Sequence, residues 1–122
     1  MTHDFDLFVI GAGPAGLAAA KQAAQYGVKM AIAEQQHLGG CCVNWGCIPK
    51  KLMVYASDFA AAMQEASDYQ WETCSSHFHW LQFREKRDRE LQRLRQVQQQ
   101  ALHQARVPLL SGHTKFVDAH TL

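Results

Sequence analysis

Three of the four cysteines of this chain lie within seven consecutive positions, shortly before a proline and two lysines. The stretch reads GGCCVNWGCIPKK and contains Cys41, Cys42 and Cys47. In a reducing compartment, clustered cysteines serve catalysis or metal binding more often than they crosslink a fold. The chemistry of this stretch is therefore either thiol redox chemistry or metal binding.

The redox interpretation requires the chain to bend between Cys42 and Cys47. A disulfide needs Cα atoms about 4.4 to 6.8 Å apart, whereas an extended chain would hold these two roughly 16 Å apart. Asn44 and Gly46 lie between them and tolerate such a bend. The spacing is therefore compatible with a disulfide across a folded loop.

A helix is expected to follow the cysteines, because Pro49 suits a first helical turn and residues 49–68 are rich in alanine. A cysteine at a helix start is favoured as a thiolate, and Lys50 and Lys51 act in the same direction. A thiol of low pKa beside a second thiol is what disulfide exchange requires.

Two alternatives remain open from the residues alone. A metal could use the three clustered cysteines with His37, although the paired C-x2-C spacing is missing and adjacent cysteines are awkward ligands. Cys74, His77 and His79 form a second possible triplet without an evident fourth ligand. Cysteines also serve as small buried apolar residues, which suits Cys74 better than the cluster.

The elements before the cysteines follow the order strand, glycine turn, helix, strand, acid. Residues 5–10 form an apolar run typical of a buried parallel strand, and residues 11–16 read GAGPAG. An alanine-rich helix is expected over 17–26, and a second strand over 28–33 leads into Glu34. This order predicts a βαβ unit of an α/β fold that binds a dinucleotide.

Each residue of that unit has a physical role in dinucleotide binding. Gly11 allows the tight turn, Gly13 lets the backbone approach a pyrophosphate, and Gly16 lets helix and strand pack closely. Glu34 is placed to bind a ribose hydroxyl. The alternative is a glycine-rich turn that serves packing alone, and the unit by itself does not separate FAD from NAD.

The remaining chain is expected to hold one long helix and two short strands. Residues 80–106 predict an amphipathic helix with a solvated charged face rather than a nucleic-acid site. Residues 108–110 and 114–117 read as two short strands of a hairpin joined at residues 111–112. Met53, Phe59 and Met63 of the preceding helix are expected to pack in the core; they are less suited to lining a cofactor.

Composition excludes several functions. The chain has 122 residues, enough for one domain or part of one, and a net charge of +1, too small to attract nucleic acid or an anionic membrane. Its first residues, MTHDFD, carry no basic side chain, and the apolar run after them is short. We therefore expect no signal peptide or spanning helix, and a cytoplasmic location.

Several stretches together resemble the FAD-binding start of the pyridine nucleotide-disulfide oxidoreductases, and most closely the glutathione reductase branch. These stretches are LFVIGAGPAG, AEQQHLGG, CCVNWGCIPKKLM, WLQFREKRDRELQRL and LLSGHTKFVDAHTL. The resemblance implies a Rossmann-like FAD/NAD(P)-binding domain, a parallel sheet with flanking helices. Residues 1–122 would form an incomplete version of it, ending in the β-hairpin. They would be the amino-terminal portion of a longer reductase, without its NADPH and dimer-interface domains.

The resemblance also implies roles for the site residues. NADPH would deliver hydride to FAD, and the flavin would reduce a Cys42–Cys47 disulfide. Cys47 would be the thiol next to the flavin, Cys42 would attack the substrate disulfide, and Lys50 would lie by the reactive flavin nitrogen. No metal is expected. The implied cofactor-binding residues are Gly11, Gly13, Pro14, Ala15, Gly16, Glu34, Gly40, Cys41, Cys42, Cys47 and Lys50.

Within the family, the Lys50-Lys51 pair is similar to glutathione and trypanothione reductases rather than to dihydrolipoamide dehydrogenases or mercuric reductases. Ala18 and Lys21 favour glutathione disulfide as the substrate, with the cation of Lys21 meeting a substrate carboxylate. A homodimer is expected of the full-length family rather than of this chain. The alternatives are a related disulfide reductase or a nucleotide-binding remnant without catalysis.

Five positions depart from the family's usual residues, and each affects binding. Cys41 replaces a threonine that helps to hold the cofactor, and a thiol is a weaker hydrogen-bonding group. Lys21 replaces an arginine and lacks its planar fork. Pro14 replaces a serine, Trp45 a smaller residue, and Gln98 a tyrosine. We therefore expect weaker FAD binding and an altered substrate site.

Overall fold

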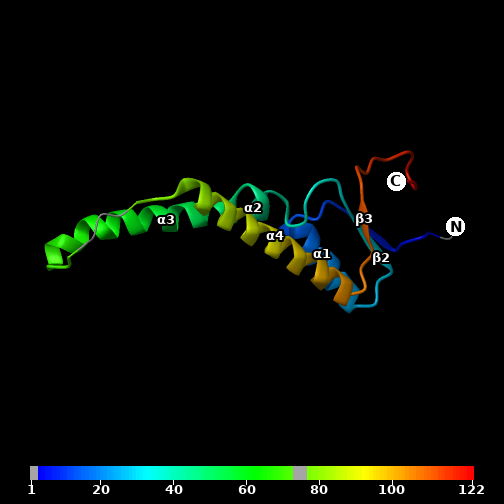
Figure 1. The fold of residues 1–122 in the computed structure, drawn as a ribbon. Coiled ribbons are helices and arrows are strands. Elements are labelled where there is room, and N and C mark those ends of the chain that lie inside the picture. Colours follow the sequence, from blue (N-terminus) through cyan, green and yellow to red (C-terminus); the bar gives the residue numbers. More distant parts are fainter. Residues whose placement is uncertain (1–2, 73–76) are drawn as a thin grey trace.

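The computed structural model describes residues 3–72 and 77–122, which form a three-stranded sheet, four α-helices and one short 3-10 turn (Figure 1). In chain order these are β1 (Leu7–Ile10), α1 (Pro14–Gln25), β2 (Met30–Glu34), α2 (Gly40–Asn44), α3 (Cys47–Ala66), η1 (Ser67–Tyr69), α4 (Trp80–Gln104) and β3 (Leu109–Ser111).

The three strands form one parallel sheet in the order β1-β2-β3. Val9 pairs with Ile32, and Ile32 pairs with Leu109 on the other side. β2 is therefore the central strand, and its residues Met30 to Ala33 are all buried. α1 connects β1 to β2, so the predicted parallel α/β arrangement is confirmed.

The predicted hairpin is wrong. Residues 109–111 pair in parallel with β2, and residues 114–117 form no strand. The flanking backbone also joins β2, since Ile32 N–H donates to Pro108 O at 3.0 Å and Gly112 N–H to Glu34 O at 2.9 Å. With these groups paired to β2, the chain continues the sheet instead of turning back on itself.

The core lies on one face of the sheet, beneath α1 and the carboxyl-terminal half of α4 (Figure 1). Ile32 and Leu102 are its largest fully buried side chains. Leu17 and Ala20 of α1 pack against them, because residues three positions apart share one face of a helix. Val107 closes the cluster just before β3.

Helix α3 extends away from this core, together with the first turns of α4 (Figure 1). Met53, Phe59 and Met63 are exposed, Phe59 by 68%, so the expectation that they pack in the core is wrong. They line an apolar groove with Phe78 and Trp80. The helical period was correct, but it cannot say what the apolar face covers.

None of the helices within residues 3–72 and 77–122 has the length and apolar content needed to cross a bilayer.

Replacing Leu102 with alanine should lower the free energy of unfolding by about 2 to 5 kcal/mol, because it opens a cavity at the centre of the core. Leu102 is only 1% exposed. Leu81→Ala in the same helix is the control, since Leu81 is 64% exposed and should change stability by about 0.5 kcal/mol or less. Urea denaturation followed by circular dichroism measures both, and equal effects would contradict this description of the core.

Candidate functional site

The glycine turn between β1 and α1 has the backbone geometry that the sequence predicted. Gly11 has a φ of 95°, a left-handed conformation that favours glycine. A Cβ at Gly16 would overlap the carbonyl oxygen of Gly11, so helix and strand approach as closely as expected. A Cβ at Gly13 would meet nothing within 4 Å, which leaves the backbone there open to a ligand. Pro14 and Ala15 begin α1 and are exposed.

Glu34 ends β2 and joins it to the glycine turn. Its Oε2 accepts a hydrogen bond from Ala12 N–H at 2.8 Å, and its Oε1 accepts one from Gln36 N–H at 2.8 Å. A carboxylate offers about four acceptor sites. Glu34 therefore holds the turn in place and keeps capacity to bind a ribose hydroxyl.

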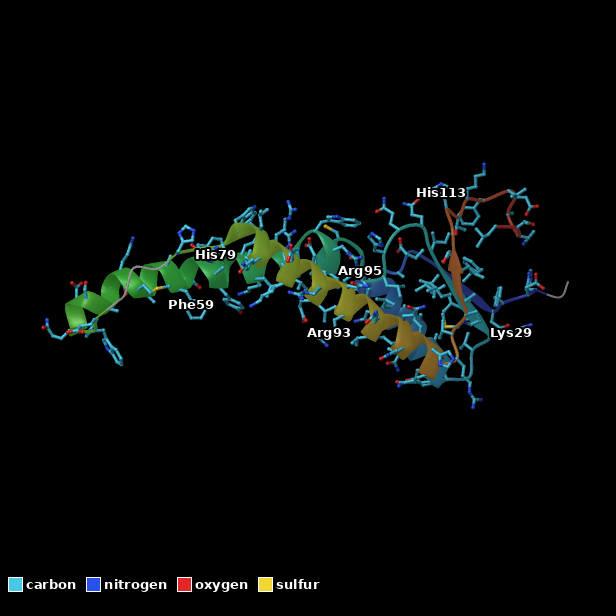
Figure 2. The ribbon with its side chains drawn as sticks, in the orientation of Figure 1. Lys29, Phe59, His79, Arg93, Arg95 and His113 are labelled. Atoms are coloured by element: carbon cyan, nitrogen blue, oxygen red, sulfur yellow. The ribbon has the colours of Figure 1, made fainter. Side chains whose placement is uncertain are left out.

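Gln35 and His113 also lie at this end of the sheet, and the sequence reasoning missed both. His113 Nδ1 is 2.8 Å from Gln35 Oε1. Figure 2 shows His113 and Lys29 at opposite ends of the sheet, so His113 marks its carboxyl end. Ligands of parallel sheets bind at that end. Recognising residues 109–111 as a parallel strand would have revealed this pair.

The cysteine loop docks directly on the glycine turn. Gly39 N–H donates to Ala12 O at 2.8 Å. A Cβ at Gly40 would come 2.9 Å from Gly13 Cα, so only glycine allows this approach. The two predicted motifs, separate in sequence, therefore form one site.

Two helices carry the cysteines: the short α2, which the sequence did not predict, and α3. Cys41 and Cys42 lie in α2, and Cys47 is the first residue of α3. Gly46 turns the chain between them, where a Cβ would lie 3.2 Å from Cys41 O. All three are free thiols, with Cys41 and Cys47 exposed and Cys42 half-buried.

The thiols of Cys42 and Cys47 lie together and interact. A hydrogen bond with the Cys47 side chain raises the pKa of Cys42, and burial and the charge of Cys47 raise it further. The Cys47 N–H acts in the opposite direction. The pKa of Cys42 is raised because its neighbour is another acidic thiol, whose negative charge disfavours a second thiolate beside it.

Asn44 holds the loop from beneath and is buried, with 5% exposure. Its Nδ2 donates to Leu38 O at 3.1 Å and to Gly40 O at 2.7 Å, and its Oδ1 accepts from Arg95 Nε at 2.6 Å. Figure 2 shows Arg95 on α4 beside α2. The sequence reasoning assigned Asn44 only a tolerance for bending and missed Arg95.

The predicted lysines lie on different helices. Lys50 is exposed one turn after Cys47, in a cleft that Trp45, Arg87 and Arg95 also line. Lys21 is half-buried on α1. On α4, Gln98 is also half-buried.

The two metal alternatives were a site of the three clustered cysteines with His37 and a triplet that includes Cys74. Cys74 lies outside the described residues, and the rings of His77 and His79 meet edge to face with centroids 4.7 Å apart. Within residues 3–72 and 77–122, no group of three histidine, cysteine or acidic side chains could hold a metal ion.

A glycine turn at the end of a parallel strand, docked on a pair of interacting thiols, defines a nucleotide-binding fold suited to thiol chemistry. The family model of the pyridine nucleotide-disulphide oxidoreductases matches residues 5–122. The chain therefore belongs to this family.

Three relatives are glutathione reductases. The chain is 50% identical to that of Nostoc sp. over 122 residues, covering all of this chain and 27% of the relative. It is 41% identical to that of Burkholderia cepacia, covering 93% of this chain and 25% of the relative. It is 39% identical to the chloroplastic/mitochondrial enzyme of Pisum sativum, covering 98% of this chain and 24% of the relative. The chain thus spans about a quarter of the length of these relatives.

Replacing Cys47 with alanine should speed the alkylation of Cys42 by iodoacetamide near neutral pH. The substitution removes the largest cause of the raised pKa of Cys42, so more thiolate is present at a given pH. The lower pKa also makes the thiolate a weaker nucleophile, so we expect a net gain of about a few-fold. Both proteins should carry Cys41→Ser, and labelling is followed by tandem mass spectrometry. An unchanged or slower rate would contradict the thiol contact.

Proposed function

We propose that this chain is the FAD-binding amino-terminal part of a glutathione reductase-like enzyme, which uses NADPH to reduce glutathione disulfide through FAD and a Cys42–Cys47 disulfide. The observation that carries this proposal is the docking of the cysteine loop on the glycine turn, through Gly39 and Ala12 at 2.8 Å. This contact brings a nucleotide-binding turn and two interacting thiols into one site. The names of the three relatives favour glutathione disulfide as the substrate.

The residues present fit FAD. Gly13 leaves open space for the pyrophosphate, the first N–H groups of α1 lack partners within the helix, and Glu34 retains capacity for a ribose hydroxyl. Gly40, Cys41 and Lys50 would complete the cofactor contacts. A bound flavin supplies the two electrons that open the disulfide.

The thiols then perform two exchange steps. The Cys42 thiolate attacks one sulfur of glutathione disulfide, which forms a mixed disulfide and releases one glutathione thiolate that takes up a proton. The Cys47 thiolate next attacks Cys42 Sγ, which re-forms the Cys42–Cys47 bond and releases the second glutathione. The substrate gains two electrons, and the cysteine pair loses two. Lys21 of α1 would meet a substrate carboxylate.

The chain would be part of a larger FAD domain, followed in the complete enzyme by NADPH and dimer-interface domains. β1 pairs with β2 alone among the described residues, and its Ile10 is 51% exposed. Parallel sheets are normally covered on both faces and their edges are protected, so the exposed β1 is suited to being covered by further chain. The chain covers 27% and 25% of the length of two relatives, which agrees with a larger domain. We assign the homodimer to the complete enzyme and the reaction to the cytosol, where thiols stay reduced.

Mild oxidation with glutathione disulfide should form a Cys42–Cys47 bond and leave Cys41 free. Peptide mapping by mass spectrometry after alkylation identifies the bond. The contact between the Cys42 and Cys47 thiols is the reason for this pairing. A pairing of Cys41 with Cys42, or the absence of any bond within the loop, would rule out the proposed chemistry.

Glu34→Gln should weaken FAD binding about tenfold. The affinity is measured at high protein concentration by the quenching of flavin fluorescence. The change removes a charged acceptor, and hydrogen bonds to charged groups contribute about 1.5 to 3 kcal/mol. Glu65→Gln in the exposed part of α3 is the control and should bind as the parent does. Equal affinities for the parent and Glu34→Gln would exclude the assigned role of Glu34. Binding without disulfide formation would instead support a nucleotide-binding remnant.

A further inference from the structure

Asn44 is the one buried polar side chain among the described residues, which makes its contacts unusual in this chain. An amide removed from water costs free energy unless its groups are hydrogen-bonded. Both contacts of Nδ2 go to backbone carbonyls near the start of α2, at Leu38 and Gly40. The remaining acceptor, Oδ1, is satisfied from a different part of the chain by Arg95.

The contact with Arg95 joins the end of α2 to α4, whereas the bond from Gly39 N–H to Ala12 O holds the start of α2 on the glycine turn. Arg95 Nε and Asn44 Oδ1 are 2.6 Å apart, and the residues are 51 positions apart in sequence. Leu91, one turn earlier on the same face of α4, is buried, so this part of α4 is held in place. Leu38 and Gly40, by contrast, belong to the loop itself.

The guanidinium of Arg95 is directed to this amide rather than to a carboxylate. The ion pairs found within the described residues join Arg87 to Asp88 and Arg93 to Glu90. A half-buried cation that donates to an amide forms a charge-assisted hydrogen bond, which is stronger than one between neutral groups. The side chain thus contributes to the shape of the cysteine loop.

We propose that Arg95 is a positioning residue for the redox pair. Asn44 follows Cys42 by two residues and precedes Cys47 by three, so its position sets the turn that brings the two thiols into contact. Holding two thiols together raises their effective concentration for each other and therefore favours the disulfide over two separate thiols. Arg95 acts on this equilibrium through Asn44. The inference rests on the proposed function for its choice of redox pair.

The test measures the equilibrium constant of the exchange in which the two thiols become a disulfide and one glutathione disulfide becomes two glutathione molecules. Purified 122-residue chain is equilibrated in buffers with different ratios of reduced to oxidised glutathione, quenched with acid and alkylated. Mass spectrometry gives the fraction with a Cys42–Cys47 bond. No flavin is required, so the measurement is independent of cofactor binding.

We expect Arg95→Met to lower this equilibrium constant about tenfold, the factor that corresponds to the loss of one hydrogen bond to a charged group. Arg93→Met is the matched control, because Arg93 lies two positions away and pairs with Glu90 on the surface; it should stay within about twofold of the parent. Arg95→Lys keeps a charged donor and should recover part of the loss. A role in stability alone would move the unfolding midpoint but leave the constant of the folded variants unchanged.

The outcomes separate the two hypotheses. If the parent chain forms no Cys42–Cys47 bond, the proposed function fails. If the parent forms the bond and Arg95→Met matches it within twofold while circular dichroism shows a folded protein, the positioning role of Arg95 is overturned. If Arg95→Met does not fold, Asn44→Ala decides the question, because it removes the acceptor of the Arg95 hydrogen bond. A constant of folded Asn44→Ala equal to that of the parent overturns the role.

Discussion

The peptide groups of Ala12 join the two halves of the site, and the remaining geometry depends on them. Its N–H donates to the carboxylate of Glu34, and its carbonyl accepts from Gly39 N–H. Ala12 is completely buried, so water does not compete for either bond. One residue of the glycine turn thereby fixes the acid of β2 on one side and the cysteine loop on the other. The Ala12 side chain belongs to the buried core, where a larger side chain would not fit.

The close approach of Gly40 to Gly13 is the steric counterpart of these bonds. Gly40 has a φ of 55°, and any Cβ there would press against Gly13 Cα. The loop can lie on the turn only because Gly40 lacks a side chain, since a Cβ at Gly13 would meet nothing within 4 Å. Gly40, directly before the cysteines, is therefore required for bringing the thiols to the glycine turn. It explains why the two motifs that the sequence presents about 25 residues apart act as one site.

The sequence predicted the features that depend on neighbouring residues. The apolar run before the glycine turn, the glycines and Glu34 define a βαβ unit locally, and Cys47 was placed correctly at a helix start. Features set by distant partners could not be predicted. The three residues of β3 look like half of a hairpin until β2 is seen to pair with them. The pKa of Cys42 depends on where the loop places Cys47, and the role of Asn44 depends on Arg95 in another helix.

The two ends of the molecule differ in how firmly they are held, and the cysteine loop lies where they meet. The core of Ile32, Leu102 and their neighbours supports the sheet, α1 and the end of α4, whereas most of α3 beyond Pro49 is exposed. Segments with few buried contacts open at a lower free-energy cost than the core does. Movements of α3 would reach the thiols through Cys47, its first residue. The contact of Asn44 with Arg95 connects α2, which carries Cys42, to the packed half of α4 rather than to the exposed part of α3.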